Sequence, residues 1–145
     1  MYKRQRYAAR LLLTLAIHED DAPVSTNSLA ELTGISAQFI EQIIRPLKQA
    51  GFITSTRGAA GGHRLGKSPA EITLGGIVRA IEGSTNIASC LDCETVCDRS
   101  DDCLTRSAWE RASRAMEREL DAITLAALMP NGECCLLYTS PSPRD

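Results

Sequence analysis

The chain has 145 residues, of which 43% are hydrophobic and 23% are charged, and its net charge is −2. This length favours one domain with at most a small appendage, and the composition excludes a disordered chain. No apolar run reaches the roughly 18 residues that a membrane span requires, and no secretion signal is recognisable. We therefore expect a cytoplasmic protein that makes no membrane contact.

Both ends of the chain resemble translated sequencing adapter. Residues 135–145 begin with Cys-Leu-Leu-Tyr-Thr-Ser, which is one reading frame of a common transposase-end sequence, and residues 1–5 match its reverse complement. We expect residues 1–5 to be a non-native leader and residues 135–145 a non-native tail. Lys3 and Arg4 are therefore not interpreted as a nucleic-acid-binding arm.

Charge is distributed unevenly between these ends. Residues 6–70 hold seven basic and five acidic residues, whereas residues 71–134 hold six basic and twelve acidic ones. A basic face for nucleic acid is expected only in the first half.

The first half of the chain predicts three helices. Residues 7–18 carry leucines at helical spacing. A short second helix is capped by Thr26 or Asn27 and ends at Gly34, and Ser36 caps a third helix that reaches about residue 50. Pro46 lies inside the third helix and should kink it or loosen its last turn.

A two-stranded hairpin is expected next. Residues 52–56 are β-branched and aromatic and predict a strand, residues 57–62 predict a glycine-rich turn, and residues 63–65 predict the returning strand. This order of elements predicts a mainly α fold, a winged helix-turn-helix with a two-stranded wing, over residues 6–83. The alternative is a plain hairpin turn without a role in nucleic-acid binding.

The second half predicts a helix that Thr73 caps and Gly83 ends, a cysteine loop over residues 84–103, and a long C-terminal helix over residues 104–128. Apolar residues recur along the long helix in steps of three and four, and charged residues occupy its other faces. We expect residues 104–130 to form a dimerisation helix; packing within one chain is the alternative. The apolar stripe consists of Trp109, Ala112, Met116, Leu120, Ile123 and Ala127.

The loop cysteines Cys90, Cys93, Cys97 and Cys103 have the spacing C-x2-C-x3-C-x5-C. Clustering of this kind favours metal or redox chemistry over a disulfide framework. Four thiolates can converge on one soft metal centre, and all-thiolate sites favour iron–sulfur clusters or zinc. A structural zinc site usually has two cysteine knuckles separated by a longer spacer, so this spacing favours a cluster.

In this order the motifs resemble the Rrf2 family of winged-helix transcriptional regulators, over essentially all of residues 6–128. The resemblance implies a homodimer that binds palindromic double-stranded operator DNA, and we expect a repressor. It also implies a sensor of iron–sulfur, redox, nitric oxide or iron status whose cluster is held by three loop cysteines. The matching segments are residues 6–10, 34–36, 40–43 with Leu47, 50–53, 57–65, 71–74 and 79–83, the cysteines, and Trp109.

The resemblance assigns three metal ligands and leaves the fourth open. Cys97 and Cys103 match the family's last two ligands and Cys90 matches the first, so Cys93 is an extra thiol and the candidate fourth ligand. A cluster held by four cysteines would favour the [4Fe-4S] form over the [2Fe-2S] form.

Three positions depart from the family's pattern. Some members place a histidine ligand three residues after the last cysteine, where this chain has Arg106. Others take a carboxylate ligand from the partner's first helix, where this chain has Arg6. The wing position that usually holds an aromatic residue holds His63, which could still contact DNA.

The third helix is expected to enter the major groove. Glu41 can accept a hydrogen bond from cytosine N4, Gln38 can pair with adenine, and Arg45 is expected to contact phosphate. Arg57 would enter the minor groove with the wing. The candidate DNA-binding residues are Ser36, Gln38, Phe39, Glu41, Gln42, Arg45, Arg57, Gly58, Gly61, Gly62 and His63.

Two other functions compete with a cluster-dependent regulator. One is a cluster-free thiol switch or zinc-stabilised regulator of the same fold. The other is a small electron carrier or an iron–sulfur assembly protein, against which an intact winged helix argues. No catalytic triad, phosphate loop or carboxylate pair is recognisable, and with two histidines in the chain we expect no enzyme.

Overall fold

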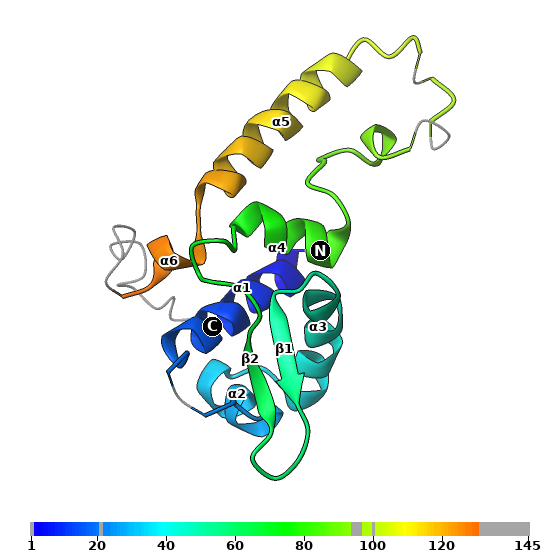
Figure 1. The fold of residues 1–145 in the computed structure, drawn as a ribbon. Helices are drawn as coiled ribbons and strands as arrows, with labels where there is room; N and C mark the ends of the chain where they lie inside the picture. The colour runs from blue at the N-terminus through cyan, green and yellow to red at the C-terminus, as the bar shows by residue number, and fades with distance from the viewer. Residues whose placement is uncertain (1, 21, 94–96, 100, 131–145) are drawn as a thin grey trace.

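The computed structural model describes residues 2–20, 22–93, 97–99 and 101–130. A body of helices carries a small hairpin at one end, and the helix α5 projects from the opposite end (Figure 1). None of the helices within these described ranges is long and apolar enough to cross a membrane. In chain order the elements are α1 (Tyr2–Ile17), α2 (Thr26–Thr33), α3 (Ala37–Gln49), β1 (Ile53–Thr56), β2 (Gly62–Leu65), α4 (Leu74–Glu82), the 3-10 helix η1 (Ser89–Leu91), α5 (Arg106–Ala122) and α6 (Leu125–Leu128).

The tight turn between α2 and α3 forms as the sequence predicts. Gly34 ends α2 with a left-handed φ of 71°, and its N–H donates to the carbonyl of Ala30. Ser36 caps α3, because its hydroxyl accepts from the N–H of Phe39 at 3.3 Å. The cap of α2 was predicted one or two residues too late. Ser25 is the cap, and its hydroxyl accepts from the N–H of Ser28 at 3.1 Å.

The wing is an antiparallel pair of strands, with Ile53 opposite Leu65 and Thr56 opposite Gly62. Ile53 is buried and Thr54 is exposed, so the first strand turns one face to the core and the other to solvent. Together with α2 and α3, this hairpin confirms the predicted winged helix-turn-helix fold.

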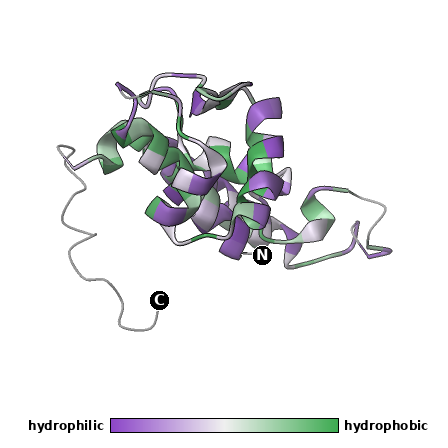
Figure 2. Ribbon diagram, turned by 90° about the horizontal axis from the view of Figure 1, so that it is seen from below, coloured by the Kyte–Doolittle hydropathy of each residue, from purple (hydrophilic) through white to green (hydrophobic). Residues whose placement is uncertain are grey.

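The hydrophobic core lies between α1, α2, α3, α4 and α6. Apolar and polar residues share α1, α2, α3 and α4, as expected for amphipathic helices around one core, and both colours run along the helices of the body in Figure 2. The short helix α6 is apolar throughout. The largest fully buried side chains are Leu11, Leu12, Leu15, Leu29, Ile40, Ile43, Leu47, Ile72, Ile77 and Leu125.

The long C-terminal helix does not run unbroken to Leu128 as predicted. It ends at Ala122, Ile123 is extended, and Thr124 caps the short helix α6. The break arises because this segment pairs with the chain before α4. The N–H of Leu74 donates to the carbonyl of Ile123, and the N–H of Leu125 donates to the carbonyl of Ile72, both at 2.9 Å.

One further expectation for a helix needs revision. The first helix begins at Tyr2 rather than at Tyr7, because residues 3–6 are good helix formers and nothing interrupts them. Pro46 lies inside α3, which runs on to Gln49 as expected. A proline at this position removes the N–H that would donate to the carbonyl four residues earlier.

Candidate DNA-binding face and cysteine loop

The third helix has one buried and one solvent-facing side. Ile40, Ile43, Ile44 and Leu47 are buried, and they follow one another in steps of three, one and three residues along the inner face of α3. The opposite side therefore faces solvent. The exposed candidates on α3 and at its cap are Ser36, Gln38, Glu41, Gln42 and Arg45.

Phe39 lies at the edge of this face and is half-buried. Its ring packs edge-on against the ring of Tyr7, with centroids 5.5 Å apart and planes at 84°. The structure therefore places Phe39 in the packing between α1 and α3, at the edge of the solvent-facing side that the other candidates share.

The wing turn presents Arg57 to solvent, next to glycines that the local backbone requires. Gly58 has a φ of 108°, and its carbonyl accepts from the N–H of Gly61 at 3.0 Å. A β-carbon at Gly62 would come within 2.7 Å of the carbonyl oxygen of Val24. Gly62 therefore lets the wing pack closely against the segment before α2.

His63 ties the wing to α2. Its Nδ1 is hydrogen-bonded to the hydroxyl of Ser55 at 2.8 Å, and its Nε2 is hydrogen-bonded to the hydroxyl of Thr26 at 3.1 Å. Burial of the ring lowers the pKa of His63, and the nearby Lys48 lowers it further, whereas Glu41 opposes the shift. Sequence reasoning assigned His63 to DNA, but both of its ring nitrogens already have protein partners.

The four loop cysteines are thiols that form no disulfide with one another. Cys90 lies in η1, Cys93 is exposed, and Cys97 and Cys103 are half-buried. The loop is tied to α5, because the N–H of Ile87 donates to the buried hydroxyl of Ser113 at 3.0 Å.

One of these thiols has a shifted pKa. Hydrogen bonding to Thr105 is the main cause that lowers the pKa of Cys103, and its Sγ lies 3.4 Å from the Thr105 hydroxyl. This position stabilises the thiolate, which is the form that binds metal.

The structure does not gather the predicted ligands into one site. Within the described part of the chain, no three His, Cys, Asp or Glu side chains lie close enough to hold a metal ion, and residues 94–96 and 100 fall outside it. The donor set nevertheless fits iron or a cluster, because it consists of reduced, soft thiols.

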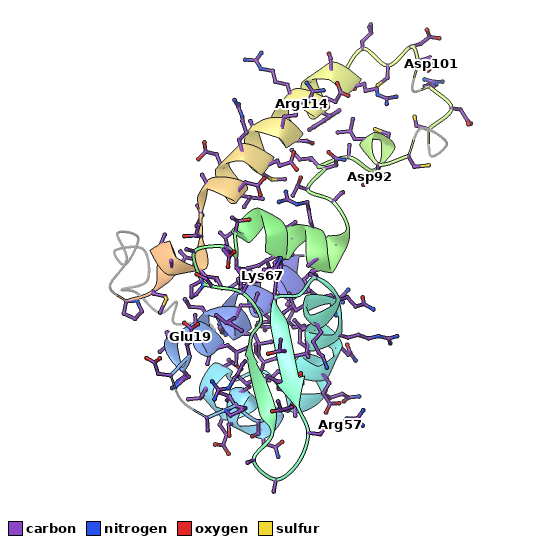
Figure 3. The ribbon with its side chains drawn as sticks, in the orientation of Figure 1. Glu19, Arg57, Lys67, Asp92, Asp101 and Arg114 are labelled. Atoms are coloured by element: carbon purple, nitrogen blue, oxygen red, sulfur yellow. The ribbon has the colours of Figure 1, made fainter. Side chains whose placement is uncertain are left out.

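The cysteine loop and the wing lie at opposite ends of the molecule. Figure 3 shows Asp92 on the loop beside α5, Asp101 on the loop beyond the far end of α5, and Arg57 on the wing.

Sequence reasoning missed the polar contact where α5 meets the body. Arg79 of α4 donates to Asp121 at 2.7 Å and to Glu117 at 3.1 Å. These ion pairs raise the pKa of Arg79, and the hydrogen bond to Asp121 is the largest cause. The signal in the sequence was the placement of Glu117 and Asp121 four residues apart on a charged face of α5.

Comparison with known proteins agrees with this architecture. The profile of the family Rrf2, described as "Iron-dependent Transcriptional regulator", matches residues 1–131. Protein rrf2 of Nitratidesulfovibrio vulgaris is 41% identical over 132 residues, which are 91% of this chain and 88% of the relative. The HTH-type transcriptional regulator IscR of Aliivibrio salmonicida is 36% identical over 128 residues, which are 88% of this chain and 76% of the relative.

Solved structures agree as well. The T. potens IscR has a TM-score of 0.68 at 35% identity, covering 86% of this chain and 81% of that one. CymR (YrzC), the global cysteine regulator of B. subtilis, has a TM-score of 0.71 at 32% identity, covering 86% and 92%. These relatives are named as regulators, which confirms that the chain is not an enzyme. The chain is a member of the Rrf2 family of winged-helix transcriptional regulators.

Proposed function

We propose that this chain represses transcription by inserting α3 into the major groove of operator DNA while Arg57 follows the wing into the minor groove. The observation that carries the proposal is the solvent-facing side of α3, which presents the exposed polar side chains of Gln38, Gln42 and Arg45. Glutamine can pair with adenine through two hydrogen bonds, and arginine can bind phosphate. Glu41 would accept from cytosine N4.

The operator is proposed to be palindromic because the protein is proposed to be a homodimer. The apolar stripe of α5 supports this dimer. Trp109 is 47% exposed and Met116 is 38% exposed, and these two large apolar side chains lie on the same side of α5. In Figure 1 this helix projects from the body, which leaves its stripe available to the α5 helix of a second copy.

We further propose that Cys90, Cys97 and Cys103 hold an iron–sulfur cluster, with Cys93 as the fourth ligand. The family's description as iron-dependent and the four reduced thiols support this assignment. When bound, such a cluster would supply a charge and an oxidation state that change with iron, oxygen or nitric oxide. Four cysteine ligands favour [4Fe-4S] over [2Fe-2S].

A metal-free thiol switch is the second candidate. It is supported by the similarity to the Staphylococcus aureus CymR, which has been solved in an oxidized form and is 32% identical with a TM-score of 0.66. The lowered pKa of Cys103 also suits a thiol that reacts as the thiolate.

Iron and sulfide content decides between these two candidates. The full chain and each Cys→Ala variant are reconstituted anaerobically, and iron, sulfide, zinc and visible absorption are measured. We expect severe iron loss for Cys90→Ala, Cys97→Ala and Cys103→Ala, and a weaker or spectrally altered cluster for Cys93→Ala. Full iron content in Cys97→Ala would refute the ligand assignment, and a wild-type protein without iron would favour the thiol switch.

A further inference from the structure

We infer that a groove between the start of α1 and the turn between α2 and α3 binds the DNA backbone, and that Arg6 and Arg10 hold its phosphates. This inference rests on the proposed function, because it assumes that α3 enters the major groove. It adds an anchor on the side of α3 that lies away from the wing, formed by residues that the sequence analysis did not assign to DNA.

The groove is basic and open to solvent. It has a volume of about 670 Å³ and is lined by Lys3, Arg6, Tyr7, Arg10, Thr33 and Gly34. None of the described residues that line it is acidic. Because Lys3 falls in the segment that we expect to be a non-native leader, the inference depends on Arg6 and Arg10 alone. These two lie four residues apart and therefore on the same face of α1.

Arg10 is positioned by two contacts. Its Nη1 lies 3.4 Å from the carbonyl oxygen of Thr33, and its guanidinium lies 5.7 Å from the centroid of the Tyr7 ring. Both contacts hold the cation beside the end of α2 and limit the conformational entropy that it would lose on binding phosphate. Arg6 is exposed, one helical turn earlier.

The groove continues to the start of α3. A second, smaller groove shares Lys3, Tyr7 and Gly34 with the first and extends to Ser36 and Phe39. A path along the surface therefore leads from Arg6 and Arg10 to the cap of the helix that is proposed to read bases.

The wing lies on the other side of α3. A separate groove between α3 and the wing is lined by Glu41, Lys48 and His63, among others. Phe39 and Glu41 therefore mark opposite edges of the solvent-facing side of α3. A helix lying in the major groove has a phosphate backbone on each side of it. One backbone would meet the wing, and the other would meet Arg6 and Arg10.

The test is the salt dependence of DNA binding by the full chain. Fluorescence anisotropy with a labelled, mixed-sequence DNA duplex is measured over a series of NaCl concentrations. We compare wild type with Arg6→Gln, Arg10→Gln and Arg10→Lys, and include Arg57→Ala as the wing variant. Arg4→Gln is the matched control, because Arg4 is exposed on the same helix and lines neither α1 groove.

We expect Arg6→Gln and Arg10→Gln each to bind about tenfold more weakly and to lower the slope of log K against log [salt] by about one. Arg10→Lys should recover most of the slope, because it keeps the charge. Arg4→Gln should behave as wild type. Circular dichroism checks the fold of each variant. If Arg10→Gln unfolds because it loses the Thr33 contact, the salt dependence of Arg6→Gln decides whether the groove binds DNA.

Two results would overturn the inference, and they are distinguishable. If Arg57→Ala changes the slope while Arg6→Gln and Arg10→Gln match Arg4→Gln, the protein binds DNA as proposed but not through this groove. If the wild type does not bind the duplex even at low salt, the proposed function fails and the groove assignment fails with it.

Discussion

The guanidinium of Arg79 on α4 lies 2.7 Å from the carboxylate of Asp121 on α5, at the point where the helix that follows the cysteine loop meets the DNA-binding body. Gly75 lies beside the same carboxylate, and a β-carbon there would occupy the position of the Asp121 oxygen. The loop runs beside α5 at Asp92 and beyond its far end at Asp101 (Figure 3), so this junction is a physical link between the proposed sensor and the body that carries the wing. Any movement of α5 relative to α4 must rearrange it.

The first prediction concerns this junction. Arg79→Ala should lower the free energy of unfolding by only about 0.5–1 kcal/mol, because Arg79 and Asp121 are 39% and 40% exposed and water screens their attraction. Gly75→Ala should lower the melting temperature no more than Arg79→Ala does, because the displaced carboxylate is the end of an exposed side chain and alanine favours the helix. Thermal unfolding followed by circular dichroism measures both, with Arg114→Ala as a control for an exposed ion pair within α5. A much lower melting temperature for Gly75→Ala than for Arg79→Ala would show that the Asp121 side chain cannot move aside.

The second prediction concerns pH. Because the folded state lowers the pKa of His63, the folded protein binds fewer protons here than the unfolded chain does. The stabilisation that neutral His63 gives the folded state is fully present above the ordinary histidine pKa of about 6.5. It is lost as the pH falls through the lowered pKa of the folded state. The melting temperature of His63→Gln should therefore fall less than that of wild type between about pH 7.5 and pH 5. His18→Gln is the control, and parallel pH profiles for His63→Gln and wild type would contradict the prediction.

The sequence anticipated the parts of this site that follow from local rules. The left-handed Gly34, the capping Ser36 and the alternation of buried and exposed residues in α3 depend on a few neighbouring residues, and all three were predictable. The hydrogen bonds of His63 and the ion pair of Arg79 join segments far apart in the chain, so no local pattern predicts them. The break at Ile123 has the same origin, because its cause is pairing with Leu74.

The cysteine loop shows a different limit. The spacing of Cys90, Cys93, Cys97 and Cys103 predicts shared chemistry, but the described residues do not bring three of them together. Thiolates repel one another, and a metal that binds all of them supplies the free energy that overcomes this repulsion.

The third prediction separates capping from DNA contact at Ser36. Aspartate is as good a cap as serine, so Ser36→Asp should keep the melting temperature, whereas Ser36→Ala should cost about 1 kcal/mol. Ser36→Asp should nevertheless weaken binding to the DNA duplex, because its carboxylate would face phosphate. Unchanged DNA affinity in Ser36→Asp would place Ser36 outside the interface.

The fourth prediction concerns the dimer. Met116→Glu should give a monomer, because the dimer would bury an unpaired charge. Ser107→Glu is the control, since Ser107 lies on the opposite side of α5 and is exposed. Light scattering at micromolar concentration measures the mass of each variant, and a monomeric wild type would rule out the proposed role of the α5 stripe.

The central claim is that iron status controls recognition of a palindromic operator. It is tested most directly by selecting duplexes from a random DNA library with anaerobically reconstituted protein and with the same protein after iron removal. We predict enrichment of one palindromic motif, at a level that differs between the iron-loaded and the iron-free protein. Equal enrichment in both states, or no enriched motif in either, would contradict the account.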